Sequence, residues 1–194
     1  MYASTPINVD RLESELRSHP DRDFVNTLLH GLRHGFDTGV QSLPTCTYKC
    51  KNLRSCIGNE EFIARELQTE LEQGHLIGPY TDDTCPYAVY RINPIGIVEG
   101  KYSGKKRIIL DLSSPHESSE HQSINSLISK EEFSLSYVKI DDAISAIKRY
   151  GAGSLMNKLD VKNAFKNCPI TNQQWLGISG QNVLLYTPLF WFKK

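Results

Sequence analysis

The sequence lacks a net charge, and this absence limits the kinds of partner that composition alone can indicate. Its 22 lysines and arginines balance 22 aspartates and glutamates, and the pI is about 7.0. A nucleic-acid-binding domain usually carries an excess of positive charge. The composition therefore does not identify a nucleic-acid-binding protein, and any basic contact surface has to be local.

The sequence also lacks long hydrophobic runs and an even number of cysteines. No stretch approaches the roughly 20 apolar residues that span a bilayer, and residues 1–6 lack the apolar centre of a signal peptide. Five cysteines without a secretory leader favour reduced thiols, so we expect an intracellular protein of the cytoplasm or nucleus, without membrane contact. The spacing of Cys46, Cys50 and Cys56 fits the close ligand pairs of zinc sites poorly, which favours ordinary thiols on a loop.

The residues that are present suffice for a folded core. The chain has 194 residues, 39% of them hydrophobic, with a mean hydropathy of −0.39. We predict an α+β fold with helices first, then a β-hairpin, then an incomplete sheet with packed helices. We place a helical leader and connector in residues 1–58 and a mixed domain in residues 59–194.

Capping residues and apolar periodicity predict four helices. The first helix follows Asn8, and the second begins at Pro20 and Asp21. The third follows Asn59, and the fourth begins at Asp141 and Asp142. In the second helix an apolar stripe predicts the packing surface: Phe24, Leu28, Leu32 and Phe36, widened by Val25 and Leu29. Gly74 and Gly151 are the expected stops of the last two helices, and residues 75–91 are interpreted as a linker.

Two β-rich runs, residues 94–98 and 107–112, predict a hairpin with a basic turn. Lys101, Lys105, Lys106 and Arg107 stand there against the single Glu99. The charges indicate either an edge protected from aggregation or a clamp for phosphate, and the pattern leaves both open. Residues 175–179 and 183–186 predict a second hairpin, turned by residues 180–182.

Asp160 stands at the end of a predicted strand, residues 154–159, and a helical turn over residues 162–167 follows it. A carboxylate at a strand end, beside free backbone N–H groups, suits metal and phosphate chemistry. A plain cap of the following turn is the alternative.

Three segments in this order carry a resemblance to a known family. Residues 104–113 read GKKRIILDLS, a helix connects them onward, and residues 158–165 read KLDVKNAF. The order resembles the amino-terminal half of a reverse transcriptase domain, its fingers and the start of its palm, over residues 5–186. Residues 5–9 and 18–25 are similar to the leader of tyrosine-recombinase-encoding retrotransposons.

The resemblance implies an RNA-directed DNA polymerase lineage with an RNA or DNA template–primer and a dNTP as partners. It implies that Asp160 and the backbone carbonyl of Val161 bind Mg²⁺ and that Asp160 is catalytic. It implies that Arg107 contacts the incoming triphosphate, with Lys105 adding charge, and that Phe165 excludes a ribose 2′-hydroxyl.

The chain departs from the family pattern at two places. Lys106 stands where the family has tryptophan, and after Tyr186 the sequence reads TPLFWFKK where the family continues to paired aspartates and a thumb. We therefore expect a truncated reverse transcriptase-like protein that is inactive alone. The alternatives are a non-catalytic nucleic-acid-binding module, an enzyme with Asp160 as phosphoacceptor or single-metal ligand, and a non-functional fragment whose apolar residues 183–192 promote aggregation.

Overall fold

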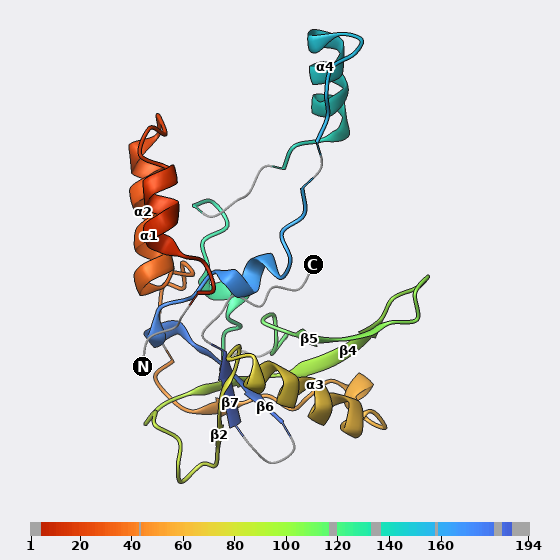
Figure 1. Cartoon of the computed structure of the whole chain (residues 1–194). Helices are drawn as coiled ribbons and strands as arrows, with labels where there is room; N and C mark the ends of the chain where they lie inside the picture. The colour runs from red at the N-terminus through yellow and green to blue at the C-terminus, as the bar shows by residue number, and fades with distance from the viewer. Residues whose placement is uncertain are drawn as a thin grey trace.

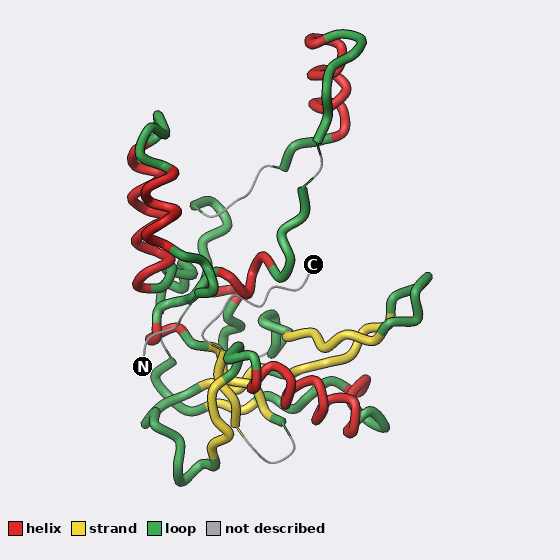
Figure 2. Tube along the Cα trace, viewed as in Figure 1, coloured by secondary structure: helices red, strands yellow, loops and turns green. Residues whose placement is uncertain are grey.

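The computed structural model describes residues 5–42, 44–116, 120–132, 137–157, 159–180 and 184–187, and within them the fold is α+β (Figures 1 and 2). Its α-helices are α1 (Val9–Glu15), α2 (Arg22–His34), α3 (Glu60–Glu72) and α4 (Ile140–Tyr150). A five-stranded sheet has the order β1-β3-β6-β7-β2, and β4 and β5 form a separate two-stranded sheet. The predicted fold class is thus confirmed.

Helices α1 and α2 form a hairpin that begins at the predicted capping residues. The Asn8 side chain accepts a hydrogen bond from the Arg11 amide at 3.0 Å, and Asp21 accepts one from the Phe24 amide at 2.9 Å. The buried face of α2 is formed by Val25, Leu29, Gly31 and Leu32. The predicted stripe is therefore partly wrong: Phe24 is exposed, and Phe36 lies beyond the helix, where it bridges to Ile170.

The five-stranded sheet is built from very short strands. They are β1 (Tyr48–Lys49), β2 (Ile77–Tyr80), β3 (Arg91–Asn93), β6 (Leu176–Ser179) and β7 (Leu184–Thr187). β1, β3 and β6 run parallel, whereas β6, β7 and β2 run antiparallel. The hairpin of β6 and β7 is confirmed, although residues 181–183 of its turn lie outside the described residues. Strands β1, β2 and β3 replace parts of the expected connector and linker, because two to four residues are too short for a periodic signal.

The first predicted hairpin is confirmed as β4 (Ile95–Glu99) and β5 (Lys106–Leu110), paired antiparallel from Ile95 with Leu110 to Glu99 with Lys106. Helix α3 packs against it through Ile63 and Leu67, in the main core with Ile95, Leu110 and Ile178. Asn59 precedes α3, but its side chain does not cap the helix. It instead donates to the Ser55 carbonyl oxygen and accepts from Lys106 Nζ at 2.6 Å.

Helix α4 forms as predicted and ends at Gly151, whose φ of +83° suits a residue without a side chain. In Figure 1 it stands away from both sheets. The strand predicted over residues 154–159 is wrong: its described residues and Asp160 form no strand, and the described side chains from Tyr137 to Phe165 are exposed. A strand is stabilised by hydrogen bonds to neighbouring strands, and both sides of β6 are already occupied, by β3 and β7.

Two further observations concern membrane-spanning helices and the division of the chain into domains. Among the described residues, no helix is long and apolar enough to cross a membrane. β1, from the first 58 residues, pairs with β3, and the division of the chain at residue 58 stays a prediction.

Truncating a core side chain provides a test of this packing. Ile95 is fully buried between α3 and the sheets, so Ile95→Ala is expected to lower the free energy of unfolding by about 2–4 kcal/mol. Val98→Ala on the exposed part of the same strand is the control, with an expected change below about 1 kcal/mol. Urea unfolding followed by circular dichroism measures both, and equal losses for the two variants would contradict the packing.

Candidate functional site

A groove joins the start of β5 to the segment that follows Asp160. It has a volume of about 370 Å³. Its lining residues come from α3, from β5 and the turn before it, and from the helical turn after Asp160: Glu66, Glu70, Lys105, Lys106, Arg107, Ile108, Asn163 and Lys166. Four of these side chains are cationic and two are carboxylates. The groove is therefore a local positive surface in a chain of zero net charge, and it suits an anionic ligand.

Three of the four cationic residues, Lys105, Lys106 and Arg107, are consecutive in the β4–β5 hairpin. Arg107 pairs with Val98 and Lys106 with Glu99 in the β-ladder, while the Gly100 amide donates to the Lys105 carbonyl oxygen at 3.0 Å. Hydrogen bonds of the backbone therefore fix the points from which these three side chains extend before any ligand arrives. An arginine gives planar bidentate contacts to phosphate, and lysines add point charge.

The fourth cation, Lys166, is held by a partly buried carboxylate. Lys166 Nζ donates to Glu70 Oε1 at 2.5 Å, and His75 Nδ1 lies 2.8 Å from Glu70 Oε2. The side chain of Glu70 is only 16% exposed, so this contact is shielded from water. We call these three residues the Glu70 cluster. It fastens the segment after Asp160 to the end of α3.

The short helix η3 (Ala164–Asn167) carries Lys166 and is tied at its end to Thr5. Asn163, before it, adopts φ +52°, a left-handed conformation that asparagine tolerates. At the other end the Asn167 carbonyl oxygen accepts from the Thr5 hydroxyl at 2.7 Å, and Cys168 follows, where burial raises the pKa of the thiol. The predicted helical turn over residues 162–167 is thus confirmed, and its position relative to the groove is well defined.

The structure brings some of the predicted site residues together and leaves others apart. Arg107 and Lys105 line the groove, whereas Asp160, Val161 and Phe165 are exposed and are not among its lining residues. Asn163 does line it, and three residues of chain span at most about 11 Å. Asp160 is therefore near the groove without facing into it.

For the magnesium ion that the resemblance implies, Asp160 is the one carboxylate assigned as a ligand. Within the described ranges, no three histidine, cysteine, aspartate or glutamate side chains gather closely enough to hold a metal ion. A single carboxylate with one backbone carbonyl is a poor match for Mg²⁺, which needs octahedral oxygen ligands and otherwise keeps its water.

Sequence reasoning missed the Glu70 cluster. Lys166 lies in the turn predicted after Asp160, so its positive charge was visible in the sequence. Its partner Glu70 belongs to a helix far earlier in the chain, and no local pattern links the two residues. A one-turn spacing of Glu66 and Glu70 on α3 is the only hint, and such spacing is common on exposed helix faces.

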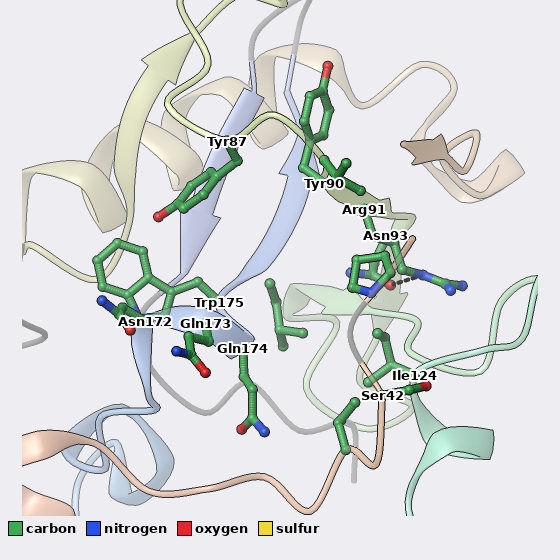
Figure 3. Close-up of a pocket in the computed structure, with 14 residues that line it drawn as sticks. Ser42, Tyr87, Tyr90, Arg91, Asn93, Ile124, Asn172, Gln173, Gln174 and Trp175 are labelled. Carbon is green, nitrogen blue, oxygen red and sulfur yellow. Dashed lines mark hydrogen bonds between the residues drawn. The ribbon is translucent and has the colours of Figure 1, made fainter. Parts of the chain in front are cut away.

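A second hollow lies between β3 and the residues before β6, and Figure 3 shows Tyr87, Trp175 and several amide side chains around it. Several of its polar groups are engaged in hydrogen bonds that support the fold. Trp175 Nε1 donates to the Ile170 carbonyl oxygen at 3.2 Å, and Arg91 Nε donates to Asn93 Oδ1 at 3.2 Å. Gln174 donates to Asp37, which lowers the pKa of that carboxyl, and accepts from Thr38. These groups are engaged in structure, so the groove at Arg107 is the better candidate for binding.

Removing the central carboxylate tests the role of the Glu70 cluster. Glu70→Ala leaves Lys166 without this partner in a partly buried place, and we expect a loss of about 2 kcal/mol in the free energy of unfolding. Amide hydrogen exchange of residues 163–167 should also become faster. Glu66→Ala, one turn earlier on α3, is the matched control for charge and helix position. If both variants exchange alike in residues 163–167, the cluster does not position this segment.

The sequence and the structure were compared with those of known proteins. The sequence matches no protein-family model, and no curated protein is significantly similar to it. Among solved structures it is similar to the foamy viral protease–reverse transcriptase in complex with double-stranded DNA, with a TM-score of 0.45 and 15% sequence identity. The match covers 98% of this chain and 39% of that chain, so this chain spans well under half of that protein's length.

Proposed function

We propose that this protein is a reverse transcriptase-like chain of retroelement origin whose groove at Arg107 binds the triphosphate of a nucleotide. The lineage is supported by the sequence segments around Arg107 and Asp160. Its likeness to the tyrosine-recombinase-encoding class rests on residues 5–9 and 18–25. The observation that carries the proposal is the groove itself, which joins those two segments although more than 50 residues separate them in sequence.

Charge and geometry support a phosphate ligand over a neutral one. Arg107, Lys105 and Lys106 come from one strand and its preceding turn, and Lys166 comes from the short helix η3. Phosphoryl groups carry charge on several oxygens, and cations at fixed positions bind them without reorganisation. Arg107 has the planar guanidinium that matches two phosphate oxygens, and it is therefore assigned the main contact.

The remaining roles follow from the resemblance as proposals. Asp160 and the Val161 carbonyl are proposed to bind Mg²⁺ once further anionic oxygens, from a triphosphate or a partner, complete the coordination. Phe165 is proposed to exclude a ribose 2′-hydroxyl and so to favour deoxynucleotides. A primed RNA or DNA template is the proposed macromolecular ligand, bound in the cytoplasm or nucleus.

The first prediction concerns triphosphate binding. Arg107→Ala is expected to weaken binding of a fluorescent dNTP analogue about tenfold or more, because a charge-assisted contact to phosphate is lost. Lys101→Ala removes the same charge from the turn of the same hairpin, outside the groove, and is expected to change binding less than twofold. Titration by fluorescence anisotropy measures both dissociation constants. Equal effects of the two variants would mean that the hairpin attracts anions only through its total charge.

The second prediction concerns nucleic acid, and it separates the proposal from a non-catalytic nucleic-acid-binding module. The module would bind template–primer in a salt-dependent way that a dNTP does not affect, and the triple variant Lys105→Ala, Lys106→Ala, Arg107→Ala would reduce its salt slope. If the groove binds a triphosphate as proposed, a dNTP should change the affinity for template–primer, and the triple variant should remove this effect. Mobility shifts at several salt concentrations, with and without dNTP, decide between the two.

The third prediction concerns catalysis. The purified 194-residue chain is expected not to extend a primed template with magnesium or manganese, because a single carboxylate, Asp160, does not hold two metal ions. A denaturing gel of labelled primer gives the readout, with an active reverse transcriptase as positive control. Robust extension that Asp160→Asn abolishes would show that the chain assembles a complete metal site.

A further inference from the structure

We propose that helix α4 pairs in antiparallel fashion with α4 of a second copy of this chain. The helix carries an apolar stripe that the described part of the chain leaves open: Ile140 is 77% exposed, Ile144 43% and Ile147 46%. Tyr137 and Val138 extend this exposed apolar surface before the helix, and Figure 1 shows α4 standing away from the sheets.

The length of α4 makes this exposure costly. An isolated helix of 11 residues is only marginally stable in water, and helices in proteins are stabilised mainly by packing of an apolar face. The capping contact between the Lys139 amide and Asp142 supports its first turn but covers none of the isoleucines. A partner that buries the stripe would therefore stabilise the helix itself.

The charges around the stripe have a definite geometry. Residues advance about 100° per position around a helix, so Ile140, Ile144 and Ile147 fall within an arc of about 60°. Asp141 and Lys148 then lie on the same flank of this arc, near opposite ends of the helix. Asp142 and Arg149 point to the far side.

This arrangement complements itself in one orientation. A two-fold axis across an antiparallel pair keeps the flank on the same side, so Asp141 approaches Lys148 of the second copy, and Lys148 approaches its Asp141. A parallel pair places the two flanks on opposite sides and joins like ends of the two helix dipoles. Among the described residues no ion pair involves Asp141 or Lys148, so both side chains are available.

The first test is the oligomeric state of the full chain. Sedimentation equilibrium over a concentration series is expected to show a monomer–dimer equilibrium, and Ile144→Asp is expected to shift it to monomer. Because α4 contributes no buried residue to the core, circular dichroism and thermal unfolding of the variant should show that the body remains folded. A wild-type chain that stays monomeric, or one that forms open-ended aggregates, overturns the proposal.

Charge reversal supplies a second test that does not depend on the apolar face. Lys148→Asp places a second carboxylate against Asp141 in both symmetric pairs and is expected to weaken dimerisation about tenfold. Adding Asp141→Lys in the same chain restores opposite charges and is expected to return the dissociation constant to within about twofold of the wild type. Arg149→Asp makes the same change at the neighbouring position on the far side and is the matched control. If Arg149→Asp and Lys148→Asp act alike, or if the double variant is not restored, the antiparallel pairing is wrong.

Discussion

The parallel pairing of β3 with β6 is the constraint on which the rest of this structure depends. Parallel strands cannot be joined by a tight turn, so the chain has to leave the sheet at Asn93 and return at Leu176. Residues 94–175 all belong to this crossover, which contains the β4–β5 hairpin, helix α4 and Asp160. The β4–β5 hairpin of this crossover packs into the core, whereas the described side chains from Tyr137 to Phe165 are exposed.

The Glu70 cluster ties the returning part of the crossover to α3. Helix α3 lies beside the hairpin through apolar contacts, and Glu70 near its end holds Lys166 of the returning segment. The hairpin cations and Lys166 are therefore linked through α3. A mixed groove with four cations and two carboxylates is the result, and the neutral composition of the chain concealed it.

Local signals in the sequence predicted the elements whose cause is local. The caps at Asn8 and Asp21, the glycine that ends α4 and the two hairpins are all found in the structure. The strand before Asp160 fails for the opposite reason: its apolar residues suit a strand, but the described residues of this segment pair with no neighbouring strand. Strands β1 and β3 were missed because two or three residues gain their conformation from their neighbours and not from their own pattern.

In the candidate site, too, the residues with a local sequence signal were predicted and those that depend on tertiary contacts were not. Arg107 and Lys105 were predicted to act together and do lie in one groove, since one hairpin carries both. Glu70 and His75 could not be found, because their importance arises from a contact with a residue far along the chain. The positions of Asp160 and Phe165 outside the groove also depend on tertiary structure that no local motif encodes.

The exposure of the chain from Tyr137 to Phe165 has a consequence for how this protein can change during evolution. The described side chains of this stretch contribute nothing to the core, and the entropy of closing a loop grows only with the logarithm of its length. Insertions placed between Gly151 and Leu159 would therefore cost the folded body little. The segment can change in length and gain contacts with other molecules while the five-stranded sheet remains unchanged.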